Sequence, residues 1–448
     1  MDGMAGRVVE SWLRRVAVTW VNHAGAPLVK VVHRRHVDLA VDIGVGFSPV
    51  ADAFRTDGLI AESHCCARPD EDLRLHLVGE ALVPLDADLG WGWAPGERRW
   101  RDGRDYEADQ RSFCRRQQES LKAESLELQV GFELEWTVAL AGQHGELLPA
   151  FPGGPYGADR LVEGFDYATE LLDALDAAGL DWMQFHPEYA TSQFELSLAH
   201  ASPTEAADRL VLARLVIYRV STSLGLRCSF APKISEQQAG NGGHLHLSVK
   251  RHGVPLLHGG SGPGGLTADG EALVAGLLDA LPMLMPIACP LASSYLRLAP
   301  SAWSAPFQVW GVENREAALR LVPMASDQIS AHLEVKSADL GANPYLLMGS
   351  LQAVAAEAIA HPRPLPEPVF GDPVLAQTTD SAHRRLPRTL EEALAVFSSS
   401  TVLREAMGEH LHSSLMDSVR AEISRCEGMT SEEVIASTRW WPLVGGLQ

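Results

Sequence analysis

Residues 131–136, GFELEW, constrain the fold of this chain more than any other segment. Glu133 and Glu135 lie two residues apart in an otherwise apolar run. In a β-strand, residues i and i+2 point to the same face, so both carboxylates would look into one cavity. Buried like charges are costly unless a cation or a basic group compensates them. The segment therefore suggests a metal site, although an exposed strand that favours solubility would show the same spacing.

Two later segments place further metal-binding side chains in extended, apolar surroundings. HPEYATSQFEL, which begins at residue 186, contains Glu188 and Glu195. In GNGGHLHLS, which begins at residue 240, a glycine loop that permits close backbone approach precedes His244, His246 and Ser248 on one strand face. A His-x-His pair is often structural or a zinc site. The nearby carboxylates and the lack of a neighbouring cysteine favour a hard cation instead.

Basic residues in three more segments could complete such a site. HLEVK, which begins at residue 332, places Glu334 and Lys336 on one extended face. SSYLRLAP contains Arg297, and ENREAALRL contains Arg315 and Arg320. The last two could be ordinary surface charges. Their apolar flanks favour contact with phosphate or carboxylate, which guanidinium geometry suits.

Two other motifs carry less weight. The glycine-rich stretch GGSGPGG at 259–265 precedes a helix expected from about Thr267, but it lacks the Gly-Lys-Ser/Thr ending of a phosphate loop. We interpret it as a flexible surface loop. No Gly-x-Ser-x-Gly elbow is present, so a serine nucleophile has little support.

Composition and charge argue against several classes of protein. The net charge of −20 is unsuited to nonspecific nucleic-acid binding. No run of eighteen apolar residues exists, so no membrane span is expected. The first twenty residues lack a signal-peptide core, and we expect them to form the first helix. The six cysteines have no CxxC spacing and fit reduced thiols. We expect a cytoplasmic protein that binds neither nucleic acid nor membrane.

The apolar pattern divides the chain near residue 105. Short apolar runs precede this point, and Pro95, Gly96 and the charged stretch GERRWRDGRDYEADQR interrupt them. Beyond it, strand and helix patterns alternate. We expect strands over 125–138, 185–198, 244–250, 313–323 and 332–338, and helices over 160–179, 206–224, 273–285 and most of 390–435. The mixture implies an α/β or α+β catalytic domain behind a small β-rich one.

These segments, in this order, resemble those of the glutamine synthetase family. The resemblance runs from about residue 15 to 440 and rests on GFELEW, HPEYATSQFEL, FAPK followed by GNGGHLHLS, SSYLRLAP, WGVENREAALRL and LEVKSADLGANPYL. The last two look closest to a divergent bacterial branch that includes γ-glutamyl-amine ligases. The resemblance implies an α+β fold, with an N-terminal β-grasp domain over 1–106 and a glutamine synthetase catalytic domain over 107–448. It also implies a homo-oligomer, commonly a dodecamer of two hexameric rings.

The resemblance further implies ATP and two or more divalent ions, Mg²⁺ or Mn²⁺, at each site. It assigns metal ligands in two sets: Glu135, Glu188 and Glu195; and Glu133, His244 and Glu334. His246 and Ser248 would lie near the nucleotide, while Arg315 and Arg320 would face its phosphates.

The carboxylate substrate would lie at the other end of the site. Here the resemblance implies Arg297 for glutamate or its acyl phosphate, with Gly240, His244 and Lys336 also in contact with substrate. Lys336 stands where the family has an arginine, and Ala239 where it has an asparagine. Lysine supplies charge but no bidentate fork. Glutamate is therefore the expected acid, and another acid is the alternative.

The segments expected to bind the amine depart further from the family pattern. Ammonia-using members have an aspartate in an N-terminal segment that reads VGFSP here, at 45–49, and a glutamate in a flap that reads PSAWSAP here, at 300–306. Trp303 stands near the place of the flap acid. It could hold an apolar or cationic amine against its ring, or simply pack the flap. The replacement base could be Glu313 or Asp52, unless the amine arrives already neutral.

The sequence therefore predicts an ATP-dependent ligase that activates a carboxylate as an acyl phosphate and couples it to an organic amine. Arg297 and Arg315 would stabilise the charge that develops during transfer, and Trp303 would face the amine. True glutamine synthetase is one alternative. A catalytically silent structural or regulatory homologue is the other, but such a protein would be expected to lose metal ligands.

Overall fold

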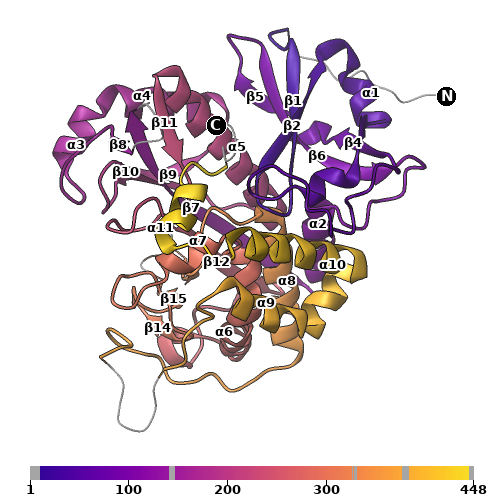
Figure 1. The fold of residues 1–448 in the computed structure, drawn as a ribbon. Coiled ribbons are helices and arrows are strands. Elements are labelled where there is room, and N and C mark those ends of the chain that lie inside the picture. Colours follow the sequence, from indigo (N-terminus) through magenta and orange to yellow (C-terminus); the bar gives the residue numbers. More distant parts are fainter. Residues whose placement is uncertain (1–10, 141–146, 325, 327–329, 376–382, 443–448) are drawn as a thin grey trace.

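The computed structural model describes residues 11–140, 147–324, 326, 330–375 and 383–442. Two sheets organise the chain, and Figure 1 shows the smaller N-terminal sheet beside the larger one, with helices packed around the latter. The expected α+β class is confirmed.

The N-terminal sheet has the strand order β2-β1-β6-β4-β3, with β5 paired to β6. Its strands are β1 (Arg15–Val21), β2 (Pro27–His33), β3 (Val45–Phe47), β4 (Leu73–Leu77), β5 (Val83–Asp86) and β6 (Trp91–Trp100). Strands β1 and β6 are parallel and the other pairs are antiparallel. Helix α1 (Val37–Asp42) packs on β4.

Two predictions for this region are wrong. The expected first helix is a strand over Arg15–Val21, while residues 1–10 lie outside the described part of the chain. The VAVTWV run of this strand is rich in β-branched and aromatic residues, which favour strands, and it is buried between β2 and β6. Residues 95–100 do not interrupt the pattern either, because they complete β6.

The larger sheet has ten strands, with the main order β14-β15-β16-β12-β7-β10-β9. They are β7 (Leu126–Leu140), β8 (Leu148–Pro149), β9 (Trp182–Pro187), β10 (Gln193–Leu198), β11 (Leu226–Ser229), β12 (Gly243–Arg251), β13 (Val254–Pro255), β14 (Trp310–Val312), β15 (Leu319–Val322) and β16 (His332–Val335). The expected strands over 125–138, 244–250 and 332–335 are confirmed. The single strand expected over 185–198 is instead a hairpin, in which a turn over 188–192 joins β9 to β10, and the strand expected over 313–323 begins only at Leu319. The segment 313–318 is a turn, with Glu313 at φ +53°.

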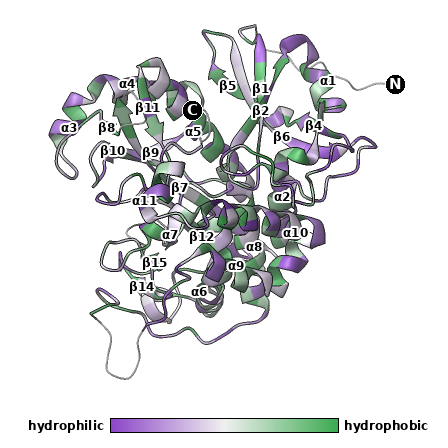
Figure 2. Ribbon diagram, viewed as in Figure 1, coloured by the Kyte–Doolittle hydropathy of each residue, from purple (hydrophilic) through white to green (hydrophobic). Residues whose placement is uncertain are grey.

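Helices cover this sheet and the seam between the sheets. They are α2 (Gln110–Ala123), α3 (Ala158–Glu163), α4 (Phe165–Ala177), α5 (Pro203–Ser223), α6 (Ala268–Ala288), α7 (Ala292–Arg297), α8 (Pro344–Ala360), α9 (Leu390–Ser398), α10 (Thr401–Cys426) and α11 (Ser431–Thr438). Helix α8 packs on α2, α5 and α6. Figure 2 shows hydrophilic and hydrophobic residues side by side on the outer helices α3 and α10, as expected for helices with one face in water.

Helix α6 is long and apolar enough to cross a membrane by length and composition alone. However, 83% of its most apolar window is buried inside the protein. It packs on α8 and α9, so it is a core helix here. The glycine stretch before it contains a short 3₁₀ turn, Pro263–Gly265, and Thr267 caps α6 through its hydroxyl.

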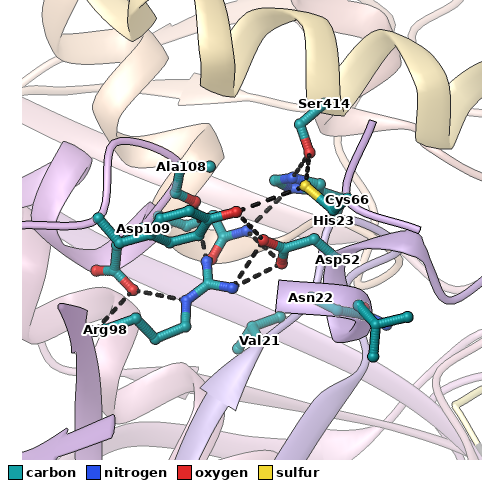
Figure 3. A network of polar contacts seen from close by, with 12 residues as sticks. Val21, Asn22, His23, Asp52, Cys66, Arg98, Ala108, Asp109 and Ser414 are labelled. Atoms are coloured by element: carbon teal, nitrogen blue, oxygen red, sulfur yellow. Dashed lines mark hydrogen bonds and ion pairs between the residues drawn. The ribbon is translucent and has the colours of Figure 1, made fainter. Parts of the chain in front are cut away.

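A buried polar network joins the N-terminal sheet to the helices (Figure 3). The Arg98 guanidinium on β6 donates to Asp52 at 2.7 Å and to Asp109, the N-cap of α2, at 2.9 Å. Arg98 and Asp52 are fully buried. This arrangement argues against Asp52 as the base, because its carboxylate is fully buried and paired with the Arg98 guanidinium.

Candidate active site

The strand register lines up acidic, imidazole and basic side chains across six adjacent strands. Glu195 of β10 lies opposite His186 of β9 on one side and Glu135 of β7 on the other. Further along, Glu133 of β7 lies opposite His244 of β12. Directly opposed residues share a face of the sheet, with Cβ atoms about 4.5–5.5 Å apart. The expected carboxylates therefore meet on one face.

The same line continues to the other edge. His246 of β12 lies opposite Glu334 of β16, and Glu334 lies opposite Arg320 of β15. Because His244 and His246 are two residues apart, they share the face that carries the carboxylates. Ser248 follows on that face, opposite Gln129.

One cluster forms around Glu133. His246 Nε2 lies 3.0 Å from Glu133 Oε1, and His244 Nδ1 lies 3.3 Å from Glu133 Oε2. His244 Nδ1 is also 3.4 Å from Glu334 Oε1. One ligand atom each from Glu133, His246 and Glu334 lies within 4.8 Å of the others. His246 thus lies within reach of the expected ligands Glu133 and Glu334.

A second cluster forms around Glu195. His186 Nε2 lies 3.2 Å from Glu195 Oε1, and His186 Nδ1 lies 3.7 Å from Glu188 Oε2. The Tyr156 hydroxyl donates to Glu188 Oε1 at 3.0 Å. His186 belongs to the segment HPEYATSQFEL, whose sequence alone indicates no role for it. Its position opposite Glu195 is visible only from the strand register.

Glu135 lies between the two clusters and is held by its neighbours. Its Oε2 accepts from the Gly242 N–H at 2.8 Å and from Gln193 Nε2 at 2.9 Å. A Cβ at Gly242 would lie 2.4 Å from His244 Nε2 and 2.8 Å from Glu135 Oε1. The glycine loop therefore leaves room for these ligands and no room for a side chain. Gln193 is a second residue that sequence reasoning missed.

The electrostatics of this face show an excess of buried negative charge. Burial, together with the charges of Glu195 and Glu188, raises the pKa of Glu135 to about 8. Burial also raises the pKa of Glu195. Burial alone would raise the pKa of Glu334, but the charges of Lys336 and His244 outweigh this effect and lower the pKa to about 2. Carboxylates crowded in this way are stabilised by divalent cations, and oxygen and imidazole donors suit a hard ion. The residues present fit the metals that the family resemblance implies.

Basic side chains border the Glu334 end of the line. Arg320 Nη1 donates to Glu334 Oε2 at 3.2 Å, and Lys336 Nζ donates to Glu334 Oε1 at 3.1 Å. Arg320 also contacts Glu313. This pairing and the exposure of Glu313 weaken the suggestion that Glu313 is the base. Arg315, in contrast, is exposed in the turn before β15, and no hydrogen bond or ion pair among the described residues joins it to the cluster.

Arg297 lies at the end of α7 beside this border and is buried. Its Nη2 donates to the carbonyl oxygens of Ser337 and, at 3.0 Å, of Ala338. A Cβ on Gly240 would lie 2.6 Å from Arg297 Cγ. Glycine at 240 is therefore needed for the arginine to lie where it does.

The segment 300–306 follows Arg297 and carries Trp303. The Trp303 side chain is 60% exposed, so it does not pack the segment closed in this chain. Its backbone N–H donates to Glu316 Oε1 at 2.9 Å. Sequence reasoning missed Glu316, although it stands beside the arginine that was singled out in ENREAALRL.

Comparison with known proteins identifies the family. The profile of the family described as "Glutamine synthetase, catalytic domain" matches residues 107–436. The chain belongs to the glutamine synthetase family. The resemblance inferred from the sequence segments is therefore confirmed.

Individual members of the family resemble this one over nearly its whole length. It is 41% identical over 444 residues to a gamma-glutamylpolyamine synthetase of Streptomyces coelicolor, covering 98% of this chain and 95% of the relative. It is 26% identical to a glutamate–methylamine ligase of Methyloversatilis universalis, covering 89% and 90% of the two chains. A crystal structure described as a novel glutamine synthase homolog superposes with a TM-score of 0.84 at 28% identity, covering 96% of this chain and 98% of that one.

Proposed function

We propose that this protein is an ATP-dependent ligase that couples the γ-carboxylate of glutamate to an organic amine. One observation carries the proposal: all six expected metal-ligand positions hold a carboxylate or imidazole, five on one sheet face and Glu188 in the adjoining turn, while the flap carries an exposed tryptophan in place of an acid. A catalytically silent homologue would not need the complete set of metal ligands. A ligase that uses ammonia would not be expected to have an exposed tryptophan in place of the flap acid.

The two clusters would hold divalent metal, Mg²⁺ or Mn²⁺, with two or more ions per site. The ligands are proposed in two sets: Glu135, Glu188 and Glu195 for one ion, with His186 beside them; and Glu133, His244 and Glu334 for the other, with His246 beside them. When bound, such ions neutralise phosphate oxygens of ATP during phosphoryl transfer. Ser248, on the same face, and Arg320, beside Glu334, are proposed to contact the nucleotide.

Lys336 and Arg297 are proposed to bind the carboxylate substrate. They approach the metal face from the end of β16 and from α7, and Gly240 leaves space for the arginine. Arg315 is proposed to reach the phosphates only with ATP present, since it is free of the cluster here. ATP activates the carboxylate as an acyl phosphate, and the amine nitrogen then displaces phosphate.

A polyamine is the finer proposal for the amine. It rests on the polyamine ligase of Streptomyces coelicolor, the relative compared above at 41% identity over nearly both chains. The acids that would bind ammonium in ammonia-using members are missing at 45–49 and 300–306.

We further propose a domain boundary between residues 106 and 107, a homo-oligomer of the family's dodecameric type, and a cytoplasmic location.

Phosphate release tests the proposal. Purified protein is incubated with ATP, Mg²⁺, glutamate and either ammonia, a monoamine, a diamine or a longer polyamine. Amine-dependent release that is fastest with a polyamine is the expected result. If ammonia is the best substrate, the protein is a true glutamine synthetase and the organic-amine proposal is wrong. If no amine-dependent phosphate release occurs, the protein is a catalytically silent homologue.

A further inference from the structure

Glu316 has an unpaired carboxylate oxygen beneath the flap. The residue follows β14 and is only 7% exposed. Its Oε1 accepts from the Trp303 N–H at 2.9 Å, while its Oε2 is buried and has no hydrogen-bond partner among the described residues. An unpaired buried carboxylate oxygen costs free energy that a cationic ligand would recover.

Glu316 lies near the Lys336 end of the metal face. Its chain continues to Ala318, whose carbonyl accepts from the Lys336 N–H at 3.1 Å. The Lys336 ammonium in turn contacts Glu334 of the metal cluster at 3.1 Å. Burial raises the pKa of Glu316, and the Lys336 charge partly opposes this rise. The carboxylate is thus near the site and is not a member of the metal cluster.

A second acid borders the same flap. Asp372 accepts from the Ser301 hydroxyl at 2.6 Å, and its charge also raises the pKa of Glu316. Asn314, two residues before Glu316, donates to the carbonyl oxygens of Val369 and Gly371 at 2.8 and 2.9 Å. The flap therefore rests on two carboxylates that a short, well-anchored turn holds in place.

The geometry points to Glu316 and Trp303 as the binding site for the protonated aliphatic amine substrate. An ammonium group would donate to Glu316 Oε2 and lie against the exposed indole, with Asp372 adding negative potential. Carboxylates form charge-assisted hydrogen bonds with ammonium groups, and indole faces attract cations. This inference rests on the proposed function and assigns its amine specificity to a residue outside the flap itself.

Glutamine at position 316 separates amine binding from a purely structural role. The amide oxygen of Glu316→Gln can still accept from the Trp303 N–H, so the flap anchor survives. Only the negative charge and the second acceptor are lost. Glu316→Asp keeps the charge on a shorter side chain and should recover part of the effect. Glu367→Gln, at an exposed position beyond α8, is the matched control.

Steady-state kinetics with two nucleophiles test the inference. One is 1,4-diaminobutane, a dication at neutral pH, and the other is hydroxylamine, which is uncharged there. Glu316→Gln should raise KM for 1,4-diaminobutane about 10- to 100-fold, the size expected for a hydrogen bond to a charged group. Its kcat/KM for hydroxylamine should stay within about twofold of the wild-type value on the same reasoning. Calorimetric titration with 1,4-diaminobutane should show the same loss of affinity without turnover.

Each outcome has a separate meaning. Equal losses with both nucleophiles would make Glu316 structural, and unchanged diamine kinetics would remove it from the amine site. Either result overturns the inference and leaves the proposed function standing. If the wild-type protein forms neither product, the proposed function fails, and the calorimetric comparison alone decides whether Glu316 binds the diamine.

Discussion

At the scale of single residues, the metal face combines predictable and unpredictable features. Glu133 and Glu135 stand out in the sequence because two carboxylates in an apolar strand need compensation. His186, Gln193 and Glu316 do not stand out, since each acquires its meaning from a neighbour distant in sequence. His186, for example, becomes part of the site only when β9 pairs with β10 and places it opposite Glu195.

Removal of Glu133 should abolish stabilisation by metal. Ligand binding to the folded state at 100 times its Kd contributes about 2.7 kcal/mol. The Tm of the wild-type protein should therefore rise on addition of Mn²⁺, and that of Glu133→Ala should not. Glu127→Ala, an exposed position on the same strand and the same side of it, is the control and should respond like the wild type. An unchanged response in Glu133→Ala would remove it from the metal site.

At the scale of elements, strand register and one glycine loop assemble the site. The alternating pattern of residues 125–138 and 244–250 was sufficient to predict β7 and β12. It could not predict their pairing, which brings Glu133 opposite His244 across more than a hundred residues. The sequence does not reveal β1 as a strand, because the burial of both of its faces removes the alternation of polar and apolar residues.

Gly242→Ala should disrupt the site without unfolding the protein. The added Cβ would lie 2.4 Å from His244 Nε2, so the imidazole or the loop must move. We expect at least tenfold weaker Mn²⁺ binding by calorimetry, which corresponds to about 1.4 kcal/mol, with an unchanged far-ultraviolet circular dichroism spectrum. Gly154→Ala, where nothing lies within 4 Å of the added atom, is the control. Unaltered metal affinity in Gly242→Ala would show that the loop does not confine the ligands.

At the scale of the whole molecule, a polar seam holds the N-terminal sheet against the helices. His23, just after β1, accepts from Gln110 of α2 through Nδ1 at 2.9 Å and contacts Ser414 of α10 through Nε2 at 2.6 Å (Figure 3). Asp52 and Arg98 lie in the same network. Composition indicates none of this, because the partners are scattered over nearly 400 residues of sequence.

The buried polar network around His23 should make the free energy of unfolding decrease as the pH is lowered. Burial lowers the pKa of His23 from 6.5 to about 4, with Asp52, His64, Arg98 and Cys66 as the charged or titratable neighbours. The unfolded chain therefore binds a proton on His23 at a higher pH than the folded chain does. This contribution is complete above pH 6.5 and is lost as pH falls towards 4.

Denaturant unfolding of His23→Gln measures the effect. Between pH 7 and pH 5, the wild-type protein should lose about 2 kcal/mol more stability than the variant, since each unit of pKa shift corresponds to about 1.4 kcal/mol. His36→Gln, at an exposed position, should follow the wild type. An equal loss in the wild type and His23→Gln would contradict the assignment of a neutral, buried His23.

The central claim is that a carboxylate is activated by phosphate transfer and then captured by an organic amine. Glutamate labelled with ¹⁸O in both γ-carboxylate oxygens tests it directly, with ATP, Mg²⁺ and 1,4-diaminobutane, by mass spectrometry of both products. One labelled oxygen should appear in phosphate and the other in the γ-glutamyl amide, because the C–O bond to phosphate breaks as the C–N bond forms. Unlabelled phosphate, or labelled phosphate only when ammonia replaces the diamine, would contradict the account.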